Sequence, residues 1–372
     1  MVRLTLTEPA LDLDFHGPGL DGQITFTRAT AANVINASGL LQNVTSGLPR
    51  FDYDPVTLKP LGMLLEQGTT NLCLQSANWS SATWTKTSMT ANNATESDPT
   101  GGTLYGGLIA TAANAQVTQV VGNLANGTVY TFSVDIAHVG GNSQVYLTMD
   151  GANFTAVAPT ASLTRVSMNQ NCTTGSFTVG IRVGNSGDIL YSGGAQLEAN
   201  TFVTTRLTTS TANVTRNLDV MTMCAPLPWL QGGDMTFFYQ FAPQGLPAGS
   251  SARFMTLSDS SNNNRIIVQC GSSYNLQVIT VVNGSNYSAG TLVTTMAVGT
   301  EYRVGISYGD GQLSVAVNGT IAQAGIAVPP QVAAWNSVAL GPLSATGGST
   351  WARRLKVYRR AMSLAQLAAL TQ

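Results

Sequence analysis

The sequence is poor in charge and contains no long apolar run. Asp, Glu, Lys and Arg together make up 9% of the 372 residues, against about 25% in a typical soluble domain. Because the net charge is −1 and nucleic-acid binding needs a basic surface, we expect no nucleic-acid partner. No stretch approaches the ~18 consecutive apolar residues of a membrane helix, so we expect no membrane partner. Residues 1–15 lack the basic and apolar segments of a signal peptide.

Histidine and cysteine are also scarce, which removes most catalytic and metal-binding patterns. The two histidines, His16 and His138, lie far apart, and no HExxH, GxSxG or P-loop pattern is present. The cysteines form no CxxC pair, so we expect free, mostly buried thiols rather than a zinc or redox site. They are Cys73, Cys172, Cys224 and Cys270. The sequence therefore predicts no catalytic residue, no metal and no cofactor.

One pair of carboxylates has a spacing that a two-carboxylate glycosidase would use. Asp52 and Asp54 stand two residues apart before Pro55, so in an extended segment they would lie on one side, ~6.5 Å apart along the strand. Asp before Pro also starts turns for local reasons alone. Asp310, a single carboxylate in a glycine-flanked turn, is far short of the roughly six to eight oxygens of a calcium site.

Thr, Ser, Asn and Gly take the place of the missing charge, and 38 residues are glycine. Threonine favours pleated strands, whereas Asn, Gly and Ser favour turns, so the composition predicts an all-β chain with many loops. With 44% hydrophobic residues the chain can fill cores, and its length predicts two or three domains. A surface with so little charge suits a subunit packed in a permanent oligomer, or a protein that meets uncharged partners such as sugars.

The pattern along the chain predicts three parts. Residues 1–72 consist of short strands and turns that would pack on a neighbouring domain or subunit. In residues 73–210 the hydrophobic period is two, which predicts an antiparallel sandwich. Residues 211–372 repeat that period, with tight turns at 309–311 and 318–319. We therefore predict tandem antiparallel β-sandwiches of jelly-roll type that follow an extended N-terminal segment.

One short helix is predicted near residue 372. Ser363 and Gln366 have the spacing of a capping box, and Met362 and Leu367 that of a hydrophobic staple. The basic run at 353–360 precedes this helix, and such a run is typical of a solvated strand face.

Aromatic rings are the remaining places at which a sugar would bind, since flat sugar faces stack on exposed rings. A tryptophan in a small sandwich commonly belongs to the core, so each one has two interpretations. Trp79 and Trp84 lie in a polar run, so they are the tryptophans least expected to be buried. Trp229 is a further tryptophan of the sequence. The glycan-binding candidates are Trp79, Trp84, Trp335 and Trp351.

Three stretches resemble a set found in bacteriophage virion proteins. The first combines FTRAT at 26–30 and GLLQ at 39–42 with PRFDYDPVT at 49–57. The second is PLGMLLE at 60–66, continued by TNL at 70–72 and WTK at 84–86. The third, GAQLE at 194–198 with TT at 204–205 and TRN at 215–217, resembles the last strand and exit of carbohydrate-binding-module-like sandwiches in the same proteins.

Residues 211–372 resemble a different group, the concanavalin-A-like or laminin-G-like lectin sandwiches. The resemblance is carried by the hairpin at 302–319 and by the closing strand and helix at 357–367. This fold binds glycans in some proteins and merely packs in others.

Together these resemblances imply a non-enzymatic structural protein of a phage virion, either a tail fibre or a head spike or capsid decoration subunit. Such a chain would be made in the host cytoplasm, dock to other virion proteins through residues 1–72, and adhere to host-surface glycans through its sandwiches. Fibres and spikes are commonly homotrimers, so its other partner would be itself. Two alternatives stay open: a tail-associated glycan depolymerase that uses Asp52 and Asp54, and a free, monomeric bacterial lectin.

Overall fold

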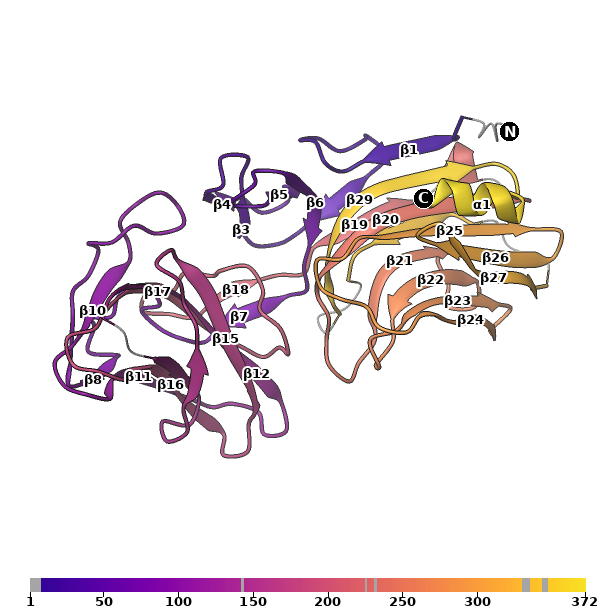
Figure 1. Ribbon diagram of the computed structural model, residues 1–372. Coiled ribbons are helices and arrows are strands. Elements are labelled where there is room, and N and C mark those ends of the chain that lie inside the picture. The colour runs from indigo at the N-terminus through magenta and orange to yellow at the C-terminus, as the bar shows by residue number, and fades with distance from the viewer. Residues whose placement is uncertain (1–7, 142–143, 225, 231–232, 330–334, 343–346) are drawn as a thin grey trace. The chain divides into compact units, whose positions relative to one another are not determined.

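The computed structural model describes residues 8–141, 144–224, 226–230, 233–329, 335–342 and 347–372 (Figure 1). It is nearly all β, and the strands pair antiparallel within each sheet, as the sequence predicts. The chain divides into two compact units. Unit 1 combines 1–39, 44–67 and 217–372, and unit 2 combines 40–43 and 68–216.

Unit 1 is a sandwich of two sheets with a long closing strand, β29, in the first of them. The first sheet has eight strands. In order they are β27 (Thr320–Ala327), β26 (Gln312–Val317), β25 (Tyr302–Gly309), β20 (Met235–Gly245), β29 (Ser349–Tyr358), β6 (Pro60–Leu65) and β5 (Arg50–Tyr53), while β1 (Leu11–Asp14) also pairs with β29.

The second sheet of unit 1 has seven strands. In order they are β2 (Thr25–Thr27), β19 (Val220–Cys224), β28 (Ser337–Leu340), β21 (Ala252–Ser258), β22 (Arg265–Cys270), β23 (Leu276–Val282) and β24 (Ser285–Val293). Alternate side chains of both sheets form one apolar core, to which Phe237 and Phe241 on β20 and Phe254 and Leu257 on β21 belong. The other face of β21 therefore carries Thr256 and Ser258.

The N-terminal strand β1 and the residue Phe15 are part of this sandwich and not a separate body. Leu11 and Leu13 on β1, together with Phe15, lie in the core of unit 1, and so do Met63 and Leu65 on β6. The division of the chain thus differs from the predicted boundaries at 72 and 210, because residues far apart in sequence pair as neighbouring strands. Residues 1–7 of the predicted docking segment lie outside the described residues, and its docking role stays a prediction.

The predicted turns and helix are confirmed. Asp310 and Gly311 connect β25 to β26, and Asn318 and Gly319 connect β26 to β27, all four with positive φ, as a type I′ hairpin turn requires. Ser363 caps α1 (Leu364–Leu370) with both bonds of the capping box. Met362 and Leu367 share one small apolar cluster, as the staple predicts. Among the described residues the other helical element is η1 (Pro228–Leu230). The strands β3 (Ala32–Ile35) and β4 (Leu41–Val44) form a separate two-stranded sheet.

Unit 2 is a second, smaller sandwich with its own core. One five-stranded sheet contains β15 (Thr164–Asn171), β12 (Val129–Gly140), β17 (Ile189–Glu198), β10 (Gly106–Ala110) and β9 (Met89–Ala91). The other contains β14 (Thr155–Val157), β13 (Val145–Thr148), β16 (Ser176–Val183), β11 (Ala115–Gly122) and β8 (Thr85–Thr87), and a two-stranded pair joins β7 (Thr69–Asn71) to β18 (Val214–Arg216).

The polar face of β12 is buried, although the alternation of its residues predicts a solvated one. The segment that follows β17 covers this face: Thr131 donates to the carbonyl of Asn200 at 2.7 Å, and Arg206 donates to both carboxylate oxygens of Asp135. Burial favours the neutral form of Asp135, but Arg165 and Arg206 outweigh it and lower the pKa of its carboxyl. Alternation of apolar and polar residues thus identifies the strand, but it does not show which segment covers the polar face.

Candidate functional site

Three of the four predicted sugar-stacking tryptophans are buried, which contradicts their interpretation as exposed platforms. Trp79 and Trp84 are 0% and 1% exposed, with ring centroids 4.4 Å apart in the core of unit 2. Their indole N–H groups donate to the carbonyls of Ser192 and Gln75. Trp335 is buried in the core of unit 1, as is Trp229, the remaining tryptophan named above. Trp79 and Trp84 can be buried within a polar run because each indole N–H group has a backbone acceptor.

Trp351 is the one predicted candidate that keeps some exposed surface. It lies on β29, where it is paired in register with Leu64 of β6. Its indole N–H donates to Asp52 at 2.7 Å, so the polar edge of the ring is already occupied.

The pair Asp52 and Asp54 does not face a common groove. Asp52 is 6% exposed and accepts from Trp351 and from the backbone of Ile35. Burial raises the pKa of Asp52 to about 6. Asp54 is partly exposed and accepts from the backbone N–H groups of Val56 and Thr57, which is the local turn that Asp before Pro predicts. These contacts engage both carboxylates in structural roles.

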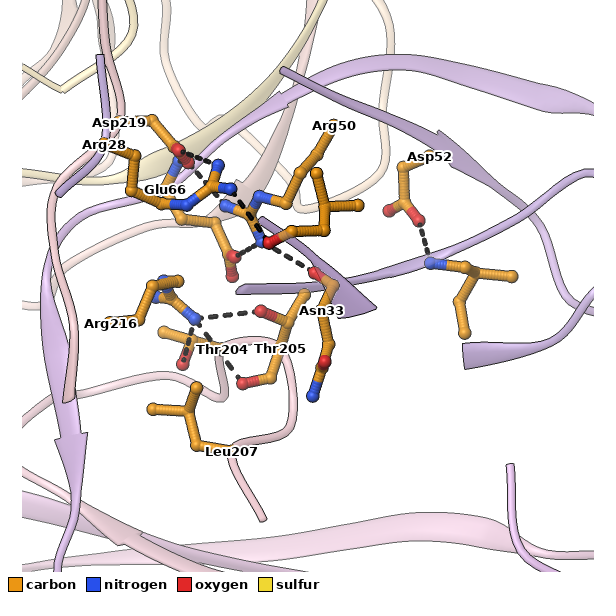
Figure 2. A network of polar contacts seen from close by, with 12 residues as sticks. Arg28, Asn33, Arg50, Asp52, Glu66, Thr204, Thr205, Leu207, Arg216 and Asp219 are labelled. Carbon is orange, nitrogen blue, oxygen red and sulfur yellow. Dashed lines mark hydrogen bonds and ion pairs between the residues drawn. The ribbon is translucent and has the colours of Figure 1, made fainter. Parts of the chain in front are cut away.

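Three residues from the stretches of the phage-protein resemblance, Arg28, Arg50 and Glu66, form a buried charge cluster with Asp219 in unit 1 (Figure 2). Asp219 accepts from Arg28 at 3.0 Å, from Arg50 and from the backbone N–H of Glu66, and Arg50 also donates to the Glu66 carboxylate at 2.6 Å. All four side chains are fully buried. Burial alone would lower the pKa of Arg50, but Asp219 and Glu66 hold it above its ordinary value.

This cluster balances two guanidinium groups with two carboxylates, so it has no net charge to offer a ligand. Its bonds join the segments around β2, β5 and β6 to the segment that leads into β19. A hollow of about 500 Å³ lies beside it, lined by Phe26, Thr27, Arg28, Ala29, Ser46, Gly47, Asn217 and Leu218. Within 26–66, Arg28, Arg50 and Glu66 therefore have a structural role in unit 1.

A second hollow, of about 240 Å³, lies on the outer face of the seven-stranded sheet. We call it the β21–β22 concavity; it is lined by Arg253, Thr256, Ser258, Ser260, Ser261, Asn262, Arg265, Ser337 and Ala339. The strand register explains the set, since Ser258 pairs with both Arg265 and Ser337 across β22 and β28. Arg253 lies nearer the start of β21, where it pairs with Gln269 of β22.

Three polar groups of the concavity have no partner in the described part of the chain. The side chain of Arg253 makes no hydrogen bond or ion pair with the described part of the chain. Thr256 is 8% exposed, and its hydroxyl has no partner among the described residues; the same is true of the buried Nε of Arg265. Unsatisfied buried polar groups are uncommon in folded proteins and call for an explanation.

The rim of the concavity is held in place by its own hydrogen bonds. The hydroxyl of Ser260 donates to Asn336 at 2.7 Å, and the side chain of Asn336 donates back to the carbonyl of Asp259. Asp259 accepts from the backbone N–H of Ser261 and from the side chain of Asn264. Because binding then requires little further ordering of the loop, such a rim favours affinity.

No family model matches this chain, and no curated protein matches it either. Solved structures resemble parts of it. They include a native heptameric SAP-like pentraxin from Limulus polyphemus (18% identity, TM-score 0.28, 38% of this chain and 71% of that one). Another is the CBM40 domain of the Ruminococcus gnavus IT-sialidase bound to α2,3-sialyllactose (14%, 0.28, 38% and 84%). A third is domain 4 of the Geobacillus stearothermophilus arabinanase AbnA in complex with arabinotriose (17%, 0.33, 42% and 73%).

These similarities are weak, and they assign no ligand to this chain. Over the described ranges, no helix is long and apolar enough to cross a membrane. No group of three or more His, Cys, Asp or Glu side chains in that part of the chain is arranged to hold a metal ion. The described cysteines are free, with Cys224 exposed and the other three buried.

Little in the sequence predicts the β21–β22 concavity. Its residues come from three strands and a loop, and hydroxyl groups are abundant throughout the chain. The feature that could have indicated this site is its pair of arginines. Because the whole chain has only 17 Lys and Arg residues, two arginines at 253 and 265 on successive strands are a local concentration of positive charge.

Proposed function

We propose that this chain is a non-enzymatic structural subunit of a phage virion that adheres to glycans through the β21–β22 concavity. The observation that carries the adhesive part is the set of hydroxyl, amide and guanidinium groups in one hollow, two of them buried and without a partner in the described chain. Sugars present a dense array of donors and acceptors, and a few fixed polar groups are what orients them in a site.

The size of the concavity also supports a sugar ligand. At about 240 Å³ it is a little smaller than the pockets of drug-sized molecules, which begin at roughly 300 Å³. It therefore suits one sugar unit of a longer glycan, with the rest of the glycan lying over the sheet. Weak binding at one such site is strengthened when several copies act together, which is a reason for an oligomer.

The virion part of the proposal is supported by the resemblance of residues 24–86 to phage virion proteins. Under this proposal residues 1–72 contact other virion proteins, and three copies assemble, on the tail or on the head. Antibody labelling of intact particles in the electron microscope tests the location, and light scattering of the purified chain counts the copies. Absence of label from particles would contradict the virion role, and a monomer in solution would favour a free lectin.

Glycan binding is tested with the purified full chain on a glycan array. We expect binding to a subset of glycans, and we expect it to persist in Asp54→Asn, which changes a residue outside the concavity. Incubation of the same protein with host polysaccharide tests the depolymerase alternative. The proposal predicts full-length polysaccharide, and shortened chains that depend on Asp52 or Asp54 would overturn it.

A further inference from the structure

The β21–β22 concavity has an uncompensated positive charge. Two arginines line it, and no Asp or Glu does. The nearest carboxylate along the chain, Asp259, has both oxygens engaged by its own loop, by Ser261 and by Asn264. No ion pair joins Asp259 to either arginine in the described part of the chain. The charge of this hollow is therefore unlike that of the buried cluster in Figure 2, in which Arg28 and Arg50 are paired with the carboxylates of Asp219 and Glu66.

The two guanidinium groups are close enough to disfavour each other. Burial, and next to it the charge of Arg265, lowers the pKa of Arg253. Arg265 is tethered by a bond from its Nη1 to the side-chain oxygen of Asn262 at 2.5 Å, which leaves its Nε without a partner. An anion between the two side chains would relieve their repulsion and satisfy Nε. A water molecule carries no charge and would not neutralise the two guanidinium groups.

The arrangement of donors matches a particular kind of anion. A guanidinium is a planar fork that binds the two oxygens of a carboxylate side by side, at shorter distance and with more specificity than a neutral donor. The hydroxyl of Thr256 lies in the lining beside the arginines and has no partner in the described chain. It adds a third donor on the floor of the site.

From this geometry we infer that the β21–β22 concavity selects an acidic glycan, and that Arg253 and Arg265 hold the carboxylate of a sialic or uronic acid. Thr256 donates to the same acidic sugar, and the Ser and Asn side chains of the loop at 260–262 take its neighbouring hydroxyl groups. This inference rests on the proposed glycan binding and adds the class of sugar. Arg253 is its most specific element, because this side chain has no other bond in the described part of the chain to explain its position.

The test uses matched pairs of sugars in which one member carries free carboxylates and the other carries them as methyl esters. The purified full chain is titrated with sialyllactose and its methyl ester, and with trigalacturonate and its trimethyl ester. We expect each acid to bind about tenfold more tightly than its uncharged partner, the effect of one or two charge-assisted hydrogen bonds. Affinity for the acids should also fall as ionic strength rises, since salt screens the attraction. Lactose sulfate distinguishes a site for carboxylate from a site for any anion, and equal binding of the sulfate would overturn the carboxylate assignment.

Two variants assign the effect to the concavity. Arg253→Gln should lose about tenfold in affinity for the acids and nothing for the uncharged sugars, and Thr256→Val, which keeps the side-chain shape, should lose several-fold. Arg303→Gln is the matched control, because it removes the same charge from β25 in the other sheet. Melting temperatures confirm that each variant is folded.

The outcomes separate the two proposals. If the acids bind no better than their uncharged partners, or if Arg253→Gln binds them like the wild type, the inference is wrong and glycan binding as such survives. If no sugar on the array or in titration binds, the proposed function fails and the inference with it.

Discussion

Trp351 donates its indole N–H to the carboxylate of Asp52 over 2.7 Å. The sequence suggests separate roles for these two residues, one as a sugar platform and the other as half of a catalytic pair. In the structure the indole N–H of Trp351 and the carboxylate of Asp52 are hydrogen-bond partners, although they lie 299 positions apart in the chain. The contact fixes β29 against the segment of β5 and β6, and it explains why a carboxylate is present at a position that is 6% exposed.

The buried Asp52 makes a prediction about pH. Its pKa is raised by burial to about 6, above the ~3.9 of an unfolded aspartate. Between these values the folded chain holds a proton that the unfolded chain has lost, so this group's contribution to stability falls as pH rises from about 4 to about 6. The difference amounts to roughly 2–3 kcal/mol, at 1.36 kcal/mol per pKa unit.

Asp52→Asn removes this titration and isolates it from the other acids. We expect the free energy of unfolding of the wild type, minus that of the variant, to decrease by roughly 2–3 kcal/mol between pH 4 and pH 7. Urea denaturation at several pH values measures it. A difference that stays constant over this range would show that Asp52 is ionised throughout.

The buried charge cluster makes a second prediction. Asp219→Asn leaves Arg28 and Arg50 with one carboxylate between them, in a site without solvent. Breaking a buried pair in this way costs about 3–5 kcal/mol. Asp12→Asn is the control, because the bond of Asp12 to Arg354 is partly exposed and such pairs contribute about 0–1 kcal/mol. Similar losses for the two variants in chemical denaturation would contradict the structural role of the cluster.

The tryptophans of unit 2 make a third prediction. Trp79→Ala should cost about 3–5 kcal/mol, as is usual for a buried aromatic ring, and should not change glycan affinity, because Trp79 lies outside the concavity. Trp79→Phe keeps a ring but loses the bond to Ser192, so its loss should be smaller. If Trp79→Ala instead abolished glycan binding and left the melting temperature unchanged, the ring would be a sugar platform after all.

A fourth prediction concerns the glycine before the GAQLE motif. A Cβ at Gly193 would lie 2.2 Å from the ring of Tyr105, whose hydroxyl donates to Asp135 at 2.6 Å. Gly193→Ala should therefore push the ring off this bond and cost about 1–3 kcal/mol. Gly122→Ala is a matched control, since nothing lies within 4 Å of a Cβ there. Thermal melting compares them, and equal stability of the two variants would contradict this packing.

The motif itself shows why parts of the resemblance are structural. Glu198 accepts from the hydroxyls of Thr69 and Thr204, and Gln196 accepts from the backbone N–H of Leu207. These buried bonds guide the chain out of β17. The residues at 194–205 therefore have a structural role at the end of the sandwich, and they do not indicate a ligand.

Local patterns were sufficient for the elements that form through near neighbours. The hairpins at Asp310 and Asn318 and the capping box at Ser363 depend on residues within a few positions of each other, and the sequence predicted them. Asp54 belongs with them, because its turn is closed by Val56 and Thr57.

What the sequence could not show depends on distant partners. Trp79 is buried because Ser192, 113 positions away, accepts its N–H. The basic run on β29 was interpreted as a solvated face, yet Arg353 and Arg354 find their acids in Glu301 and Asp12. The β21–β22 concavity likewise requires the register of three strands, so no window of the sequence contains it.

The most direct test of glycan binding at this concavity is a map of the ligand on the protein. Backbone amide signals of the purified full chain are followed by NMR during titration with the glycan that binds most tightly on the array. The account predicts that the largest shifts fall on β21, on the loop at 259–264, on β22 and on β28. Shifts concentrated in unit 2, or on the eight-stranded sheet of unit 1, would contradict it.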